Sequence, residues 1–156
     1  MAEGANPPKK GFIMFDLSQL EISDSSVFTV TDARGNDVVI DGRPFTITVA
    51  SPGTEKAVNA QFKRDEARSG RMIGAATGTK SKRTAKDDYL ERAEFLLAVV
   101  EATSHPDVTY QNKTGTAALR AMLLAPKLAH IAEGLEKHHH DRGNFSAESP
   151  TASPSA

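Results

Sequence analysis

The segment from Thr84 to His105 constrains the fold more than any other part of the chain. Its apolar residues recur at the spacing of one helix face and then widen to most of the circumference. They are Leu90, Ala93, Phe95, Leu96, Leu97, Val99 and Val100. Thr84 to Asp87 is similar to a capping box, and His105-Pro106 marks the end of the segment. A helix with so little polar surface must be covered by other elements, so we expect it at the centre of the core.

Strand signals precede this helix, between residues 27 and 50. Phe45, Ile47 and Val49 alternate with threonines, which gives one buried and one exposed face. A second β-branched and aromatic run spans residues 27–31, and Asp41-Gly42 is a turn signal between the two runs. The pattern predicts a short β-hairpin or a three-strand meander over residues 27–50.

Three further helices are expected around the central one. Thr54 can cap a helix over residues 54–69, in which Val58 and Phe62 share a face. Another helix runs from Thr114 to Leu124, and the last begins at Pro126. Phe145 follows Gly143 and can fold back on the last turn. The predicted fold class is therefore α+β, a meander followed by about four helices, with residues 84–145 forming a helical half.

The two ends contribute little to this domain. Residues 1–11 are small and polar, and residues 146–156 are rich in serine and proline. Neither stretch has the apolar area that would offset the entropy of ordering it. We expect disorder at both ends and a single domain over residues 12–145.

Composition narrows the function classes. The formal net charge is −1, which does not favour electrostatic binding of nucleic acid or membrane by the whole protein. The chain has no cysteine, so disulfides, thiol catalysis and cysteine-rich zinc sites are excluded. No run resembles a signal peptide or approaches a membrane span. We expect a soluble protein that stays in the cell that makes it.

Residues 70–83 combine small residues with positive charge, and we interpret them as a flexible basic loop. Its candidate binding residues are Arg68, Arg71, Lys80, Lys82 and Arg83. Such a loop could bind phosphates or an acidic protein, or could simply keep the protein soluble. It lacks the aromatic residues that stack on bases, so we do not expect nucleic acid to be the partner.

No residue pattern indicates catalysis or metal binding. His138, His139 and His140 point about 100° apart on a helix, so they cannot converge on one ion. The carboxylates lie in turns, caps and helix surfaces, without the apolar pocket that separates the pKa values of a catalytic pair. We therefore expect no enzyme activity, no cofactor and no metal.

The order of these motifs resembles the tail assembly chaperones of long-tailed, siphovirus-type bacteriophages. The resemblance covers residues 16–145 and rests on a strand with two turns, an alanine- and arginine-rich helix, a long apolar helix, a short helix before proline, and a closing motif. The corresponding stretches are Ala33 to Asn36, Asp41 to Val49, Ser51 to Ala60, Phe95 to Val100, Thr114 to Pro126, and Asp141 to Phe145.

The resemblance implies a binding role in virus assembly. Such chaperones coat the tape measure protein, help recruit tail tube protein, act in the host cytoplasm and are absent from the finished virion. Our candidate partner-binding residues are Met122, Leu128, Ile131 and Leu135, which could also close the protein's own core. A homo-oligomer remains open. The alternatives are a structural or tail-completion protein retained in the virion, and a small nucleic-acid-binding regulator that uses residues 63–86.

Overall fold

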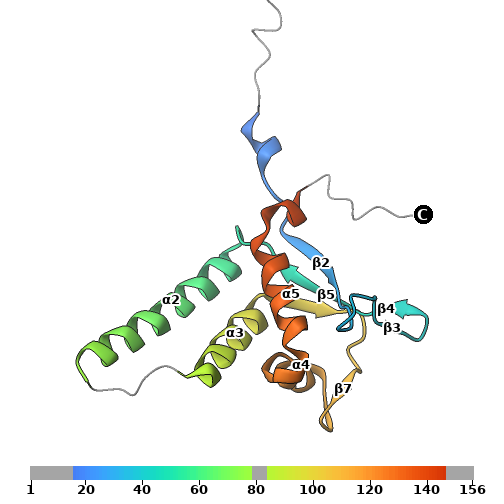
Figure 1. The fold of residues 1–156 in the computed structure, drawn as a ribbon. Coiled ribbons are helices and arrows are strands. Elements are labelled where there is room, and N and C mark those ends of the chain that lie inside the picture. The colour runs from blue at the N-terminus through green and yellow to red at the C-terminus, as the bar shows by residue number, and fades with distance from the viewer. Residues whose placement is uncertain (1–15, 79–83, 147–156) are drawn as a thin grey trace, which may run out of the picture.

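Helix α3 (Ala85–Val99) lies at the centre of the protein, as the sequence predicted. It packs against helices α2 (Glu55–Ala76), α4 (Gly115–Leu124) and α5 (Ala129–His140). The computed structural model describes residues 16–78 and 84–146 (Figure 1). The disorder expected for residues 1–11 and, apart from Ser146, for residues 146–156 falls on residues outside those described. The four helices and few antiparallel strands of the described residues confirm the predicted α+β class.

The capping box of α3 is present. The Thr84 hydroxyl accepts a hydrogen bond from the Asp87 backbone N–H, and the Asp87 carboxylate accepts one from the Thr84 backbone N–H. Ala93, Phe95, Leu96 and Val99 are buried, whereas Leu90 is partly exposed. The helix ends at Val99, whereas the sequence placed its end at His105-Pro106, and residues Val100–Thr103 form a strand instead.

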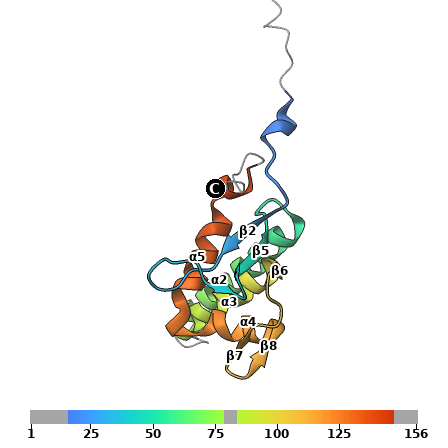
Figure 2. The same cartoon turned by 90° about the vertical axis from the view of Figure 1, so that its right-hand side faces the viewer.

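The main sheet differs from the predicted meander. Its three antiparallel strands are β2 (Ser25–Thr29), β5 (Thr46–Ala50) and β6 (Val100–Thr103), in the order β2-β5-β6 (Figure 2). The third strand therefore follows α3 directly and does not come from residues 27–50. Phe28 lies opposite Ile47, and Ile47 lies opposite Thr103.

The remaining strands predicted in residues 27–50 form a separate hairpin. Strands β3 (Val39–Ile40) and β4 (Arg43–Pro44) pair with each other outside the main sheet. Asp41 and Gly42 adopt positive φ angles of 52° and 78° between them, as a tight hairpin turn requires. A second small hairpin, β7 (Thr109–Tyr110) and β8 (Lys113–Thr114), leads into α4.

Helix α2 is longer than predicted. The sequence predicted an end at residue 69 and a flexible loop over 70–83, but the helix continues to Ala76. Gly70 lies inside the helix, where a glycine costs about 1 kcal/mol relative to alanine. Figure 1 shows that α2 projects from the body of the protein, with α3 along one side.

The described residues also form three short 3₁₀ turns, η1 (Leu17–Leu20), η2 (Pro126–Leu128) and η3 (Arg142–Phe145). Helix α5 and the turn η3 close the C-terminal end of the domain, and η3 contacts β2. Phe145 is buried beside the rings of His138 and His139, which confirms that it folds back. Its carbonyl accepts a hydrogen bond from the Ser23 N–H at 2.6 Å, so the segment before β2 lies next to the segment after α5.

Candidate protein-binding surface

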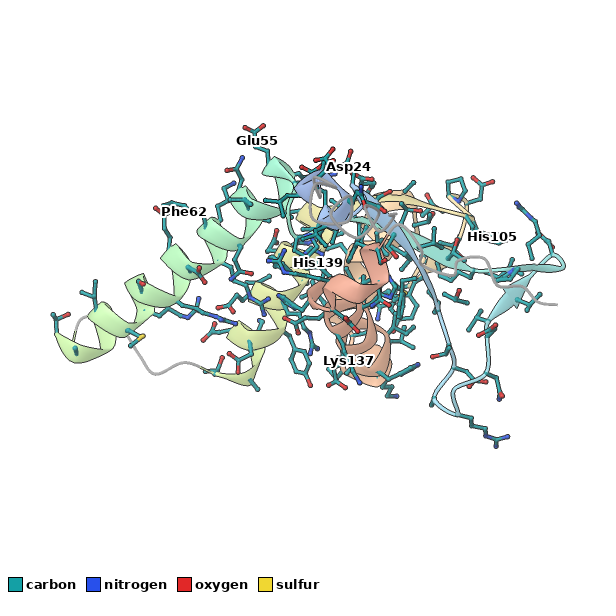
Figure 3. The ribbon with its side chains drawn as sticks, turned by 90° about the horizontal axis from the view of Figure 1, so that it is seen from above. Asp24, Glu55, Phe62, His105, Lys137 and His139 are labelled. Atoms are coloured by element: carbon teal, nitrogen blue, oxygen red, sulfur yellow. The ribbon has the colours of Figure 1, made fainter. Side chains whose placement is uncertain are left out.

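The largest set of exposed apolar side chains lies on α2. Val58, Phe62, Met72 and Ile73 are 54%, 62%, 72% and 64% exposed. At 3.6 residues per turn they share one face of the helix, together with the exposed Ser69 between them. We call Val58, Phe62, Ser69, Met72 and Ile73 the outer stripe. Figure 3 shows Phe62 pointing away from α3 and from the body of the protein.

The opposite face of α2 attaches the helix to the body. Ala57 and Ala60 are buried there, and their small side chains let α2 approach closely. Beyond Ala60 the contact with α3 is carried by charged groups. The apolar contribution of α2 to the core is therefore confined to its first turns, and the larger apolar side chains of the helix remain in solvent.

A buried carboxylate holds the middle of α2 to α3. Arg64 Nε lies 3.1 Å and Arg68 Nε 2.7 Å from Glu91 Oε1, and Arg71 Nη2 pairs with Oε2 of the same carboxylate. Arg64 also contacts Glu136 on α5 at 2.7 Å and stacks over the Phe95 ring at 4.8 Å. Three arginines therefore neutralise one glutamate that is almost completely buried.

The electrostatics of Glu91 follow from this geometry. Burial alone raises the pKa of Glu91, but the hydrogen bonds from the three arginines outweigh it and hold the pKa at about 2. The carboxylate is therefore charged throughout the physiological range. Its contacts orient α2 and leave the outer stripe on the side facing away from α3.

A shallow groove adjoins the first half of the outer stripe. It measures about 390 Å³ and lies between α2 and the C-terminal end of α5, with Val58 and Phe62 on one wall and His140 and Arg142 on the other. A second groove of about 360 Å³ between α2 and α3 is lined by apolar residues, among them Leu90 and Phe95, and by charged residues, among them Arg64, Arg71 and Glu91. The first groove extends the outer stripe with apolar, aromatic and basic groups.

The predicted partner-binding residues do not form a free surface. Leu135 is 0% exposed, and Ile131 and Met122 are buried with it in the core. Leu128 is partly buried and packs against the same cluster. The choice of these four as surface contacts was wrong, because α5 and α4 use this stripe to cover α3 and the sheet.

The prediction of a basic loop is also corrected in part, because the first residues of that segment belong to α2. Arg68 and Arg71 lie on α2 and bind Glu91, so they belong to the interface between α2 and α3. Lys80, Lys82 and Arg83 lie outside the described residues. For the described part of the segment, the positive charge is therefore used inside the protein.

The three consecutive histidines at the end of α5 pack against aromatic rings or form hydrogen bonds within the protein. His139 is buried, with its ring edge against Phe95 and Phe145. Burial lowers the pKa of His139 to about 4, so its ring is neutral at physiological pH. His138 bonds to the Ser26 hydroxyl at 3.0 Å, and His140 stacks on Phe95. Among residues 16–78 and 84–146, no group of three histidine or carboxylate side chains is placed to hold a metal ion.

Comparisons with protein-family models, with curated proteins and with solved structures found no match. In the described part of the chain, no helix combines the length and the apolar character that a membrane span needs. The outer stripe of α2 is thus the feature of the structure that most directly indicates a function. The sequence signal for it was available: Val58 and Phe62 are followed on the same face by Asp65 and Glu66, which are expected in solvent rather than in a core.

Proposed function

We propose that this protein is a non-catalytic tail assembly chaperone of a long-tailed bacteriophage. In this role it binds an apolar helical stretch of the tape measure protein through the outer stripe of α2 and helps to recruit tail tube protein. The observation that carries the binding role is the exposure of Phe62, Met72 and Ile73 on a helix that projects from the body. The phage assignment is supported by the motif order described for residues 16–145.

The physical case for binding is the apolar area left in solvent. Fully burying one large apolar side chain is worth about 1.5–3 kcal/mol. Phe62 and Ile73 expose more than half of their surface. A partner that covers both side chains therefore gains a substantial part of this burial free energy from each of them. Amphipathic helices commonly bind through side chains spaced three and four residues apart, which is the spacing of the outer stripe. Met72 adds a flexible contact that adapts to different partner side chains.

The setting of the proposed function is the host cytoplasm. A chaperone of this kind acts before the tail tube closes around the tape measure protein and then leaves. We therefore expect the protein in lysates of infected cells and not in the virion. Mass spectrometry of purified particles tests this, and stoichiometric amounts of the protein in the tail would favour a structural role instead.

Co-expression tests the chaperone activity and its location together. The tape measure protein is expected to be soluble with the wild-type protein and insoluble without it. The double variant Phe62→Ser/Ile73→Ser removes two of the large apolar side chains of the outer stripe. It is expected to leave the tape measure protein insoluble. Val27→Ser is the matched control, because Val27 is 52% exposed on β2 and lies outside the stripe.

Two results would contradict the proposal. Equal solubility of the tape measure protein with and without the wild-type protein would reject the chaperone function. Full activity of Phe62→Ser/Ile73→Ser, combined with normal folding of that variant, would reject α2 as the binding surface.

A further inference from the structure

A groove of about 750 Å³ lies between helix α4 and the hairpin of β7 and β8. Ala117, Ala121 and Leu124 of α4 line one side of it, Tyr110 of β7 lines the hairpin side, and Pro126 lines one end. We call this feature the α4 groove. None of its residues belongs to the outer stripe, and Figure 1 shows α2 and β7 extending to different sides of the body.

Local backbone structure fixes both walls of the α4 groove. The hairpin turn places Gln111 and Asn112 at positive φ angles of 52° and 63°, as a tight turn of type I′ requires. At the other end Pro126 begins η2, where proline cannot continue α4. A groove with preformed walls loses little conformational entropy when a ligand binds.

The outward face of α4 is apolar, although the outward face of a surface helix is usually polar. Arg120 is the single charged residue of the helix. Ala117, Ala121 and Leu124 flank it and line the α4 groove. The core already takes the opposite face of the helix, which consists of Ala118, Leu119, Met122 and Leu123. A ligand that fills the groove therefore needs apolar side chains.

The charges of the α4 groove all have one sign. Lys113, Arg120 and Lys127 line it, and none of the described residues that line it is acidic. Both lysines are exposed, and neither forms an ion pair with a described residue. Arg120 pairs with Glu94 of α3, but the two side chains are 42% and 54% exposed, so this pair contributes little. The whole chain has a net charge of −1, so the positive excess is local to this groove.

We propose that the α4 groove binds an acidic segment of a partner protein. Apolar side chains of that segment pack on Ala121 and Leu124, and its carboxylates pair with Lys113, Arg120 and Lys127. A nucleic acid would satisfy the three cations, but its phosphate backbone offers no apolar group to the α4 side of the groove. The site lies apart from the outer stripe and does not rest on the proposed function.

The spread of the cations defines the ligand further. Lys113 precedes α4 and Lys127 follows it, so the two lysines lie beyond opposite ends of a helix of 10 residues. At 1.5 Å per residue this helix is about 15 Å long. A helical ligand that lies along α4 therefore needs carboxylates about ten residues apart to reach both lysines, with apolar residues between them.

Fluorescence anisotropy with a labelled helical peptide of glutamate, leucine and alanine tests the site. The full chain is expected to bind this peptide saturably and more weakly as the salt concentration rises. Two further peptides carry glutamine in place of the glutamates or in place of the leucines, and both are expected to bind at least about tenfold more weakly. A labelled single-stranded DNA of equal charge provides the nucleic-acid comparison.

Variants of the groove locate the binding. Lys113→Glu/Lys127→Glu is expected to raise the dissociation constant of the acidic peptide at least about tenfold. The matched control is Arg43→Glu/Lys137→Glu, which changes the net charge equally at exposed positions on β4 and α5. Ala121→Phe fills the groove from a partly exposed position and is expected to weaken binding without a change of charge.

The outer stripe is the competing location for the peptide. Phe62→Ser/Ile73→Ser is expected to bind it like the wild type, and loss of binding in that variant would overturn the proposal. Failure of the wild-type protein to bind the acidic peptide would also overturn it. So would tighter binding of the DNA, or equal binding by Lys113→Glu/Lys127→Glu. Far-UV circular dichroism checks that each variant keeps its helix content.

Discussion

Replacing Glu91 with glutamine keeps the shape of the side chain and removes the charge that Arg64, Arg68 and Arg71 share. Folding lowers the pKa of Glu91 from 4.5 to about 2. A shift of this size corresponds to about 3 kcal/mol in favour of the charged form. Removing one member of a buried ion pair costs about 3–5 kcal/mol. Because Arg68 and Arg71 keep partial access to water, we expect Glu91→Gln to lower the free energy of unfolding by about 3 kcal/mol at pH 7.

Urea unfolding followed by far-UV circular dichroism measures this loss. Glu94→Gln is the matched control on the same helix, because Glu94 pairs with Arg120 on the surface and is 54% exposed. An exposed pair is worth about 1 kcal/mol or less, so the control is expected to lose no more than that. A loss for Glu91→Gln as small as that of the control would refute the buried arginine cluster.

The pH dependence provides an independent check on the same carboxylate. The folded-state pKa of Glu91 is depressed, so its contribution is complete above the unfolded value near 4.5 and is lost as the pH falls toward 2. The difference in stability between wild type and Glu91→Gln should therefore shrink over that interval. A difference that stays constant down to pH 2 would show that the charge of Glu91 is not the cause.

Four further predictions concern single residues. His139 is neutral in the fold with a pKa of about 4, so stability is lost as the pH falls from 6.5 toward 4, and melting temperatures of His139→Phe should vary less over that range. Gly70→Ala should gain about 0.5–1 kcal/mol, since nothing lies within 4 Å of its added Cβ. Gly134→Ala should not gain, because its Cβ would lie 3.2 Å from Phe28, and equal gains in urea unfolding would contradict this contact. Phe145→Ala should lower the free energy of unfolding by about 3–5 kcal/mol. A loss below about 1 kcal/mol would show that Phe145, and with it η3, is not part of the core.

Local signals in the sequence predicted local structure well. The capping box at Thr84 was identifiable because both of its hydrogen bonds join residues three apart. Strand β6 was not predicted, because Val99 and Val100 continue the apolar pattern of α3 across the helix end. Val100 is a strand residue because it pairs with Val49, which is far away in the sequence. No local pattern carries that information.

The length of α2 was missed for a related reason. Ser69-Gly70 is a reasonable helix terminus when only neighbouring residues are considered. Arg68 and Arg71 bind Glu91 on the next helix, and this long-range contact stabilises the turns on either side of Gly70. The same contact places two of the five residues predicted for the basic loop, Arg68 and Arg71, in an ion-pair cluster between α2 and α3.

The candidate surface shows the limit of periodicity arguments. A stripe such as Leu128, Ile131 and Leu135 indicates an apolar face but not what covers it, and here the core covers it. Val58 and Phe62 looked equally suited to a core. They are exposed because the neighbouring Ala57 and Ala60 make the contact with the body instead. The acidic residues that follow on the same face were the sequence signal for exposure, and the packing of α2 on α3 shows which face is buried.

Photo-crosslinking tests the central claim, that the outer stripe of α2 is the protein-binding surface, most directly. A photoreactive amino acid replaces Phe62 in one variant and Val27 in another, because both side chains are more than half exposed but only Phe62 lies in the stripe. In cells that co-express the tape measure protein, irradiation is expected to link it to position 62 and not to position 27. Cross-links from position 27 with none from position 62 would contradict the account.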